Sequence, residues 1–297
     1  FKHHFQKVSV LTSEDINQYN YPELKDIDDT CKFTFSNTKN FHGVRNFIKI
    51  LFLSHEYKLI YIRYSQSQIF ITFLLSIFLK EKLVLEVNSF GTQYRKWFSI
   101  FDAIFLSRIV NCVCISDVVA SYARKFMTSE ANVIVVPNGV SAERLASGPI
   151  GHSSNLCYIG VLKPNYGLEK FMDAFLETEL CRMGGVLHIF GGGSLQARLS
   201  GKYSCKSIFF HGPQPWFQVR DFLTREAPVL VYPSAGSFSF QSPIKMYEYL
   251  ASGLPIIAQH THNIQQLHID FPYFEIGNLE EKSEIDALYE SISSSPD

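Results

Sequence analysis

Short apolar runs alternate with helical patterns along most of this chain. In the first half the runs are continuous rather than alternating, a pattern typical of strands covered on both faces of a parallel sheet. They predict strands at VSVLT (8–12), LIYIR (59–63), LVLEV (83–87), VNCVCI (110–115) and NVIVV (132–136). Helical patterns fit between them, at about 43–54, 66–80 and 117–128.

The second half repeats this scheme after a segment rich in Gly, Ser and Pro, PNGVSAERLASGPIGHSSN, which is typical of a linker. Strands are predicted at 155–160, 186–190, 207–211, 228–233, 254–258 and 273–276, and helices at about 167–179, 194–200, 215–225, 243–252 and 281–293. The alternation predicts an α/β protein with two doubly wound domains around a central cleft. We expect domains at 1–140 and 155–297, joined by a linker at 141–154.

Charge and cysteine content narrow the possible partners. The net charge is −1, which gives no case for nucleic acid, but residues 1–150 hold 17 Lys and Arg against 13 Asp and Glu. This small excess would suit an anionic membrane or acceptor. The six cysteines show no C-x-x-C spacing, and Cys112 and Cys114 would share one face of a strand. We expect buried thiols, a reducing compartment and no metal site.

The ends and the most apolar segment of the chain bear on its location. IFITFLLSIFL (69–79) is too short to span a bilayer, and no signal peptide is visible. We therefore expect a cytoplasmic protein. The chain begins at Phe1 with a sequence typical of the end of a helix, so we expect its first strand to be missing.

The most informative segment is SPIKMYEYLASGLPII (242–257), which follows an apolar run and a loop. Ser242 and Pro243 are typical of a helix start, and Gly253 of its end. Lys245 would place a cation in the first turn, where the helix dipole is already positive, so an anion is expected there. Glu248, one turn later, could accept hydrogen bonds from a sugar diol. The alternative is an ordinary amphipathic helix.

Three glycine-containing loops follow predicted strands of the second half. Gly160 and Lys163 lie after the first strand, Gly191 and Gly192 after the second, and Gly212 begins a Gly-Pro turn after the third. Glycine allows close approach of a backbone to a ligand, and lysine offers a charge for phosphate. Neither G-x-G-x-x-G nor a P-loop is present, and each loop could equally be only a turn.

In the first half, polar residues follow two predicted strands. Arg63 ends one, while Glu86, Asn88 and Ser89 end the next. A carboxylate within an apolar strand is costly unless it is paired or functional. A structural Arg63–Glu86 pair and a binding role remain equally open.

Taken in order, YIGVLKPNYG, FGGGS, FFHGPQP, VYPS and SPIKMYEYLASGLPII resemble the donor half of glycosyltransferase family 4, which has the GT-B fold. NVIVVPNGV (132–140), after CISDVVASYA, resembles the family's segment that leads from the acceptor domain into the linker. The resemblance covers nearly the whole chain and is strongest from about 110 to 258.

The resemblance implies transfer of a sugar from a nucleotide-sugar to an acceptor, with retention at the anomeric carbon and without a metal or other cofactor. It implies that Lys163 and Lys245 hold the diphosphate, that amides near Ser242 and Pro243 add hydrogen bonds, and that Glu248 binds the ribose. Gly160 and Gly192 would let the donor lie close. Without Mg²⁺, fixed cations and a helix terminus must stabilise the charge that develops on the leaving diphosphate.

Three positions depart from the family pattern. Phe240 stands where the family often has a second glutamate, and Val161 where it often has an arginine, which leaves Lys163 alone in its loop. Asn88 stands where the family has an acceptor-side histidine, and an amide cannot act as a base. The family's opening strand and glycine-rich acceptor loop are absent from this sequence.

The sequence therefore predicts a retaining glycosyltransferase that uses a UDP- or GDP-sugar and acts on a glycan or lipid-linked acceptor in polysaccharide or glycolipid assembly. We expect catalysis to depend on Lys163, Lys245 and Asn88, with Arg63, Glu86 and Ser89 on the acceptor side. A peripheral contact with the inner membrane is expected from the basic first half. The alternatives are a sugar-nucleotide 2-epimerase of the same architecture and a nucleotide-binding chain without turnover.

Overall fold

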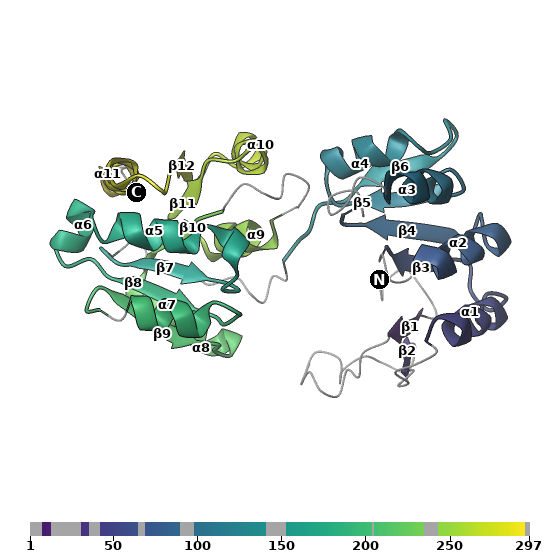
Figure 1. The fold of residues 1–297 in the computed structure, drawn as a ribbon, viewed down its shortest axis with the longest axis horizontal. Coiled ribbons are helices and arrows are strands. Elements are labelled where there is room, and N and C mark those ends of the chain that lie inside the picture. The colour runs from purple at the N-terminus through teal and green to yellow at the C-terminus, as the bar shows by residue number, and fades with distance from the viewer. Residues whose placement is uncertain are drawn as a thin grey trace. The chain divides into compact units, whose positions relative to one another are not determined.

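The structure is a computed structural model that describes residues 8–12, 31–35, 42–64, 69–89, 98–140, 153–203, 205–234 and 243–294. The chain divides into two compact units, Phe1–Val136 and Pro137–Asp297, which are described separately below (Figure 1). This division falls at the end of the last strand of the first unit. The predicted linker at 141–154 lies mostly outside the described residues.

The C-terminal unit is built on a parallel sheet that six of the described strands form, in the order β12-β11-β10-β7-β8-β9. The strands are β7 (Leu156–Ile159), β8 (Leu187–Phe190), β9 (Ile208–Gly212), β10 (Val229–Tyr232), β11 (Ile256–Gln259) and β12 (Glu275–Gly277). The helices are η6 (Pro164–Tyr166), α5 (Leu168–Phe175), α6 (Glu179–Arg182), α7 (Gln196–Lys202), α8 (Trp216–Glu226), α9 (Ile244–Ser252), α10 (His262–Asp270) and α11 (Lys282–Ser294).

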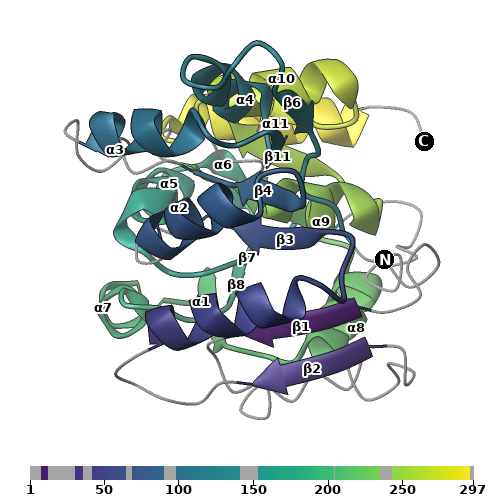
Figure 2. The same ribbon diagram turned by 90° about the vertical axis from the view of Figure 1, so that its right-hand side faces the viewer.

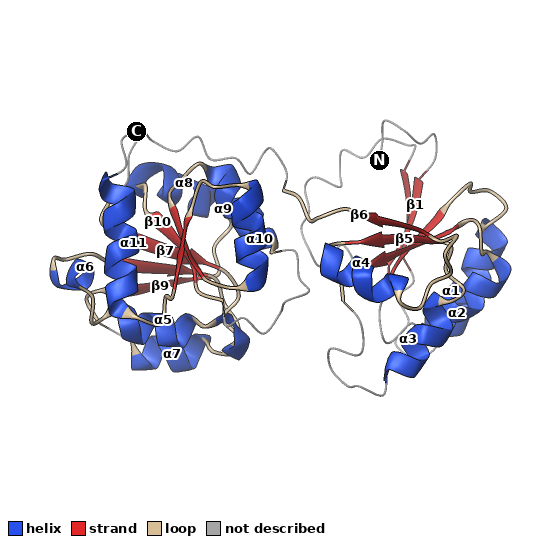
Figure 3. Cartoon of the chain, turned by 90° about the horizontal axis from the view of Figure 1, so that it is seen from above, coloured by secondary structure: helices blue, strands red, loops and turns tan. Residues whose placement is uncertain are grey.

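Both faces of this sheet are covered by helices, with α5, α7 and α11 on one side and α8, α9 and α10 on the other (Figure 3). Successive strand residues therefore enter two different cores: Leu156 and Tyr158 pack on the first side, and Cys157 and Ile159 on the second. All four residues of β7 are buried. This explains why the strands read as continuous apolar runs, and it confirms the doubly wound prediction for this unit.

The N-terminal unit contains two separate parallel sheets among its described residues. One pairs β1 (Val8–Thr12) with β2 (Cys31–Phe35) (Figure 2). The other has the order β3-β4-β5-β6, made of β3 (Ile60–Arg63), β4 (Leu83–Val87), β5 (Asn111–Cys114) and β6 (Asn132–Val135). The helices are α1 (His42–Leu53), α2 (Ile69–Phe78), α3 (Phe98–Leu106) and α4 (Asp117–Arg124).

The prediction that strands of the first half are covered on both faces is wrong for the described part of this sheet. In β4 buried and half-buried residues alternate, and in β6 half-buried and exposed residues alternate. The strands follow one another in sequence order, and right-handed crossovers then place their connecting helices on one face. Figure 3 shows α2, α3 and α4 on the same side. The strand 8–12, predicted as part of a single sheet, pairs with β2 instead.

The buried thiols predicted on β5 are confirmed. Cys112 and Cys114 point to the same covered face, their Sγ atoms lie 3.6 Å apart in a hydrogen bond, and both are free thiols. None of the helices in the described residues is both long and apolar enough to cross a membrane.

Candidate functional site

The predicted donor-side residues gather at one edge of the C-terminal sheet. Gly160 follows β7, Gly191 and Gly192 follow β8, Gly212 ends β9, and Lys245 lies in α9 after β10. Because the strands are parallel, their carboxyl ends meet at the same edge. The chain runs outward from β7 to β8 and β9 on one side, and from β10 to β11 and β12 on the other. The boundary between β7 and β10 is the switch point where open α/β sheets bind ligands.

A pocket lies at this switch point. Its walls are the end of β7 with the loop after it, the 3-10 turn, the end of β10 and the start of α9; the residues are Tyr158, Ile159, Gly160, Val161, Tyr166, Tyr232, Pro233 and Lys245. Its volume is about 60 Å³, enough for a phosphate-sized group but not for a whole nucleotide-sugar. Two of the predicted site residues, Gly160 and Lys245, therefore line one cavity.

Three tyrosines in this pocket are functional candidates that the motif analysis missed. Tyr158, Tyr166 and Tyr232 surround the space beside Lys245. Burial raises the pKa of Tyr232 to about 12, with the neighbouring Tyr166 adding to the effect, so the hydroxyl stays protonated and can donate a hydrogen bond. Tyr158 and Tyr232 lie at the ends of β7 and β10, just before the loops that form the site. This position is the signal that could have identified these two tyrosines.

Helix α9 is fixed to β7 by a buried tyrosine. The Tyr249 hydroxyl accepts a hydrogen bond from the Ile159 N–H at 2.8 Å and lies 3.3 Å from the Ile159 carbonyl oxygen, to which it donates. Tyr249 is one turn of helix after Lys245, so this contact holds the lysine over the end of β7.

We expect Tyr249→Phe to destabilise the C-terminal unit by about 1–3 kcal/mol, because the Ile159 N–H would remain buried without an acceptor. Urea unfolding of the full chain measures this. Tyr273→Phe, which changes an exposed tyrosine, is the matched control and should change stability by less than about 0.5 kcal/mol. Equal effects of the two changes would show that the buried hydroxyl has no special role.

Lys245 is already paired within the protein. Its Nζ lies 2.7 Å from Oε2 of Glu248, one turn later, and Glu248 is buried. The cation at the positive end of α9 is thus balanced by a carboxylate on the same helix. An anion bound at this terminus would share Lys245 with Glu248.

The predicted start of this helix needs a correction. The helix begins at Ile244, with Pro243 in an extended conformation at the N-cap, and not at Ser242 and Pro243. Ser242 lies outside the described residues. The predicted end is confirmed, because Gly253 has φ of 70° and its N–H bonds to the carbonyl of Leu250. The first N–H groups of α9 remain without helical acceptors, as in any helix.

The glycines after β8 are required by contact with the loop after β7. Gly191 and Gly193 have φ of 124° and 155°, and a Cβ on either would overlap a backbone atom of residues 160–162. The Leu162 N–H donates to the carbonyl of Gly192 at 2.9 Å. A Cβ on Gly192 would meet Pro213 instead. Packing of loop on loop therefore accounts for these glycines, and a contact between Gly191 or Gly192 and a donor stays a prediction.

The other two predicted glycines, Gly160 and Gly212, take part in backbone hydrogen bonds between the same loops. The Gly160 N–H bonds to the carbonyl of Phe190, and the Gly191 N–H bonds to the carbonyl of Gly212, both at 2.9 Å. Gly212 has φ of 69°. The loops after β7, β8 and β9 thus form one hydrogen-bonded layer along the site edge.

Lys163 lies in the loop after β7, between Val161 and Tyr166 of the pocket lining. It is the residue before the 3-10 turn Pro164–Tyr166, makes no side-chain capping hydrogen bond to it, and has an exposed side chain. Lys163 does not itself line the pocket. Lys245 lines the pocket, whereas Lys163 lies in a loop of which Val161 and Tyr166 line it, and a joint contact of the two lysines with a ligand stays a prediction.

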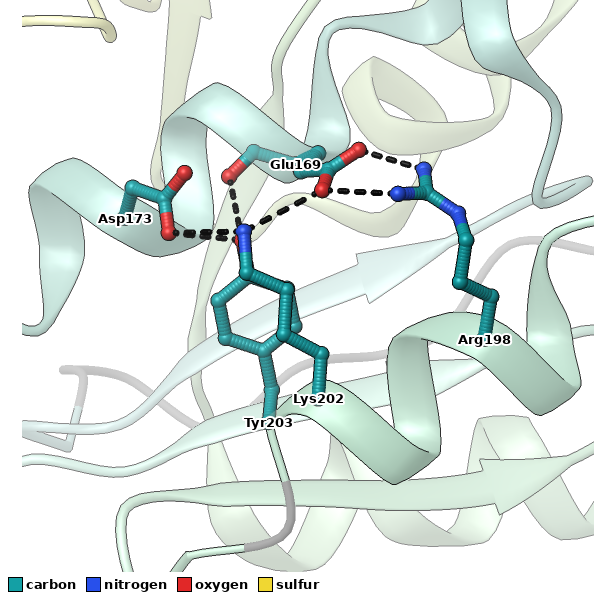
Figure 4. A network of polar contacts seen from close by, with 5 residues as sticks. All are labelled: Glu169, Asp173, Arg198, Lys202 and Tyr203. Carbon is teal, nitrogen blue, oxygen red and sulfur yellow. Dashed lines mark hydrogen bonds and ion pairs between the residues drawn. The ribbon is translucent and has the colours of Figure 1, made fainter.

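A charged network ties together the helices that follow two of these loops. Arg198 of α7 forms a bidentate pair with Glu169 of α5, Lys202 bonds to Glu169 at 3.2 Å, and Tyr203 donates to Asp173 at 2.6 Å (Figure 4). Its members are mostly exposed, so its contribution to stability is small. It joins α5 to α7 at the surface, while the loops that precede these helices are held together by their own backbone hydrogen bonds.

A histidine pair on β8 and β9, with both rings against Phe222 of α8, was not predicted from the sequence. His188 Nδ1 lies 2.9 Å from His211 Nε2, and His211 stacks on Phe190 with ring centroids 4.2 Å apart. Burial, together with the neighbouring His211, lowers the pKa of His188 to about 4, and burial also lowers the pKa of His211. The pair is therefore neutral near pH 7, with one ring donating to the other.

This pair predicts a pH dependence of stability. Because the folded pKa of His188 is below the unfolded value of about 6.5, its contribution is complete above that value and falls as the pH drops toward 4. The stability advantage of the wild type over His188→Gln should therefore shrink between about pH 7 and about pH 5. Urea unfolding at both pH values measures it, with His262→Gln, at an exposed position of α10, as the control. A constant difference would contradict the neutral pair.

The predicted acceptor-side residues meet in the N-terminal unit. Arg63 and Glu86 are register partners on β3 and β4, with Nε and Oε1 3.6 Å apart. With its amide assigned from hydrogen-bond geometry, Asn88 donates to Glu86 at 3.0 Å and accepts from Arg63 Nε at 2.8 Å. The structural pair is thus confirmed, and Asn88 joins it. Ser89 follows, half-buried.

Tyr61 extends this group and was not predicted. It precedes Arg63 on the same exposed face of β3, and burial together with the charge and hydrogen bond of Glu86 raises its pKa to about 12. The group presents a cation, a carboxylate, an amide and a phenol in one place, all capable of binding hydroxyl groups. Within the described residues, no cluster of three side chains suited to hold a metal ion is found.

Comparison with family models gives one match. Residues 153–293 match the family described as glycosyl transferases group 1. These residues make up nearly all of the described C-terminal unit, including the loops after β7, β8 and β9 and the start of α9. No curated protein sequence matches the chain.

Solved structures resemble the whole chain in fold. Sucrose-phosphate synthase from Thermosynechococcus elongatus has a TM-score of 0.70 at 14% identity, over 99% of this chain and 81% of that one. HepE of Anabaena, solved with UDP and glucose, has a TM-score of 0.69 at 12% identity, over 98% and 90%. The lipopolysaccharide outer core galactosyltransferase WaaB has a TM-score of 0.64 at 15% identity, over 97% and 90%. The fold is that of the two-unit GT-B glycosyltransferases, as predicted.

Proposed function

Because residues 153–293 are a domain of the glycosyl transferases group 1 family, we propose that this chain transfers a sugar from a UDP- or GDP-sugar to a glycan or lipid-linked acceptor. The observation that carries the proposal is the pocket between β7 and β10, where Lys245 and the N-terminus of α9 meet three tyrosines. A structural neighbour, HepE, was solved with UDP-glucose, which supports a nucleotide-sugar donor.

The diphosphate of the donor binds at the N-terminus of α9 in this proposal. The helix supplies free N–H groups and a positive dipole end, and Lys245 supplies a full charge. Lys163 approaches from the loop after β7, and Glu248 binds the ribose. As the bond to the sugar breaks, negative charge grows on the diphosphate, and these fixed positive groups stabilise it more than they stabilise the bound donor.

The reaction retains the configuration of the anomeric carbon and needs no metal, since the lysines and helix terminus take the place of a divalent cation. On the acceptor side, Arg63, Glu86 and Asn88 position a hydroxyl group. Asn88 cannot remove a proton from it, so the leaving diphosphate takes that proton. We place the reaction on the cytoplasmic side of the inner membrane, in polysaccharide or glycolipid assembly, with the basic N-terminal half toward the lipid.

A panel of UDP- and GDP-sugars, incubated with and without lipid-linked acceptors, tests the function. Release of nucleotide together with an extended acceptor supports it, and the anomeric configuration of the product by NMR tests retention. Activity that survives EDTA supports metal independence. Interconversion of the donor sugar would instead identify an epimerase, and nucleotide binding without turnover on any acceptor would contradict a transferase.

A further inference from the structure

Four polar side chains gather on one face of the β3-β4-β5-β6 sheet, and they are Tyr61 and Arg63 of β3, Glu86 of β4 and Asn88 just after it. Neighbouring residues of a strand point to opposite faces. Leu85 and Val87 are completely buried on the face that α2, α3 and α4 cover (Figure 3), so Glu86 between them points to the other face. Tyr61 is 42% exposed and the Arg63 side chain 68%, so a ligand can reach this group.

The polar atoms of this group hold one another in place. Arg63 Nε lies 3.6 Å from Oε1 of Glu86 and donates to the amide oxygen of Asn88 at 2.8 Å. The amide nitrogen of Asn88 donates to Glu86 at 3.0 Å, and Tyr61 is hydrogen-bonded to the same carboxylate. A guanidinium and a carboxylate that are already fixed side by side lose little conformational freedom when a ligand binds. The group is therefore organised in advance for a ligand.

The chemistry of the group matches the hydroxyl groups of a sugar. A hydroxyl group both donates and accepts hydrogen bonds, so it can donate to the Glu86 carboxylate and accept from the Arg63 guanidinium at the same time. The Asn88 amide offers a further donor and acceptor beside them. The exposed ring of Tyr61 adds an apolar surface with a polar tip. A pyranose ring presents hydroxyl groups and an apolar C–H face together, and this surface offers a partner for each.

Charge favours an uncharged sugar over a phosphate or a uronic acid. Glu86 balances the positive charge of Arg63, and burial together with Glu86 raises the pKa of Tyr61 to about 12, so its phenol is neutral near pH 7. Val113 and Ile134, the register partners of Glu86 across β5 and β6, add no charge. An anion would be attracted by Arg63 and repelled by Glu86, whereas a hydroxyl group uses both. In the pocket of the C-terminal unit, by contrast, the N-terminus of α9 adds positive charge to a paired lysine.

We propose that Tyr61, Arg63, Glu86 and Asn88 bind one uncharged sugar unit, with adjacent hydroxyl groups on the guanidinium and the carboxylate and the C–H face of the sugar on the Tyr61 ring. This inference deepens the proposed function, on which it rests only in taking the bound sugar to be the acceptor. It narrows the acceptor to one whose reacting end is a neutral sugar, whether or not a lipid is attached further along. Tyr61 is the residue that selects a sugar ring over other hydroxyl compounds.

Ligand-observed NMR on the full chain tests the proposal, with the methyl glycosides of glucose, galactose, mannose and N-acetylglucosamine as neutral probes and glucuronate as the anionic probe. We expect at least one neutral glycoside to bind more tightly than glucuronate. Tyr61→Leu should lower the affinity for that glycoside about three- to tenfold, whereas Tyr61→Phe, which retains the ring, should keep most of it. Tyr273→Leu removes a 78% exposed tyrosine of the C-terminal unit and is the matched control, which should bind as the wild type does.

Glu86→Gln tests the charge argument by itself. Glutamine keeps the shape of the side chain and leaves the charge of Arg63 unbalanced. The affinity for glucuronate relative to the neutral glycoside should therefore rise about tenfold. Urea unfolding shows which variants are folded, and the comparison is made among those.

Four results would overturn the proposal. The wild type binds none of the neutral glycosides, or it binds glucuronate more tightly than all of them. Tyr61→Leu binds as well as the wild type, or Glu86→Gln leaves the preference between neutral and anionic sugars unchanged. Binding of a glycoside needs no donor, so UDP binding and sugar transfer, measured on the same preparations, report separately on the transferase.

Discussion

Lys245→Ala should weaken binding of the nucleoside diphosphate by about 1.5–3 kcal/mol, which is roughly ten- to more than a hundredfold in Kd. The lysine is the cation that lines the pocket at the switch point, beside the N-terminus of α9. Its loss removes a charge-assisted contact to the diphosphate. Isothermal titration calorimetry with UDP and GDP measures the effect, and turnover should fall at least as much because the leaving group carries more charge than the bound donor.

Removal of Lys245 should also lower the stability of the C-terminal unit, and this effect must be measured separately from the loss of affinity for diphosphate. The carboxylate of Glu248, 2.7 Å away and buried, would lose its partner and destabilise the unit. The double variant Lys245→Ala with Glu248→Gln should recover the stability without recovering the affinity for diphosphate. Lys170→Ala is the matched control, since Lys170 forms an ion pair of the same length, 2.7 Å to Glu280, away from the pocket. Undiminished affinity in Lys245→Ala would refute the placement of the diphosphate.

Gly191→Ala should destabilise the C-terminal unit by about 3 kcal/mol or more. Residue 191 has φ of 124°, and a Cβ there would overlap the carbonyl oxygen of Gly160 in the loop after β7. Neither loop can move away freely, because hydrogen bonds join the ends of β7, β8 and β9. Any folded variant should also show weaker nucleotide binding, since the loop after β7 forms a wall of the pocket.

Gly201→Ala is the control for this change. Gly201 lies within α7, and a Cβ there would meet no neighbouring atom within 4 Å. It should stabilise the chain by about 0.5–1 kcal/mol, because alanine loses less backbone entropy than glycine in a helix. Urea unfolding compares the two variants. A Gly191→Ala protein as stable as the wild type would show that the two loops separate easily.

Local patterns predicted the elements of the C-terminal unit well. Apolar runs separated by helical patterns predicted all six strands of its sheet, with end positions within about two residues. The end of α9 was predicted correctly because Gly253 has an unambiguous local role as a helix terminator. Helix α10 was not predicted, because its sequence HNIQQLHID carries only a weak apolar stripe.

The sequence predicted only part of the candidate site. The same residue type can contact a ligand or serve the packing of the protein, and the sequence does not distinguish the two. Gly160 and Lys245 line one pocket, but the glycines at 191 and 193 resemble ligand-contact glycines in sequence and are explained by loop packing. A structural Arg63–Glu86 pair was one of the two interpretations left open, and the two side chains do pair. That Asn88 joins them was not predicted. Tyr158, Tyr166 and Tyr232 could not be distinguished from core tyrosines before the strands were assembled.

The sequence by itself determined the α/β class, the six strands of the C-terminal sheet and the loops that meet at the donor edge, since these follow from short-range periodicity and turn chemistry. It did not predict β2, α3 or α10. The tertiary structure alone decided that His188 of β8 and His211 of β9 share a hydrogen bond and that the Tyr249 hydroxyl of α9 accepts a hydrogen bond from the Ile159 N–H of β7. Each of these depends on which surfaces of distant segments are brought together, and an apolar run has the same composition whether its neighbour is a core, water or a lipid.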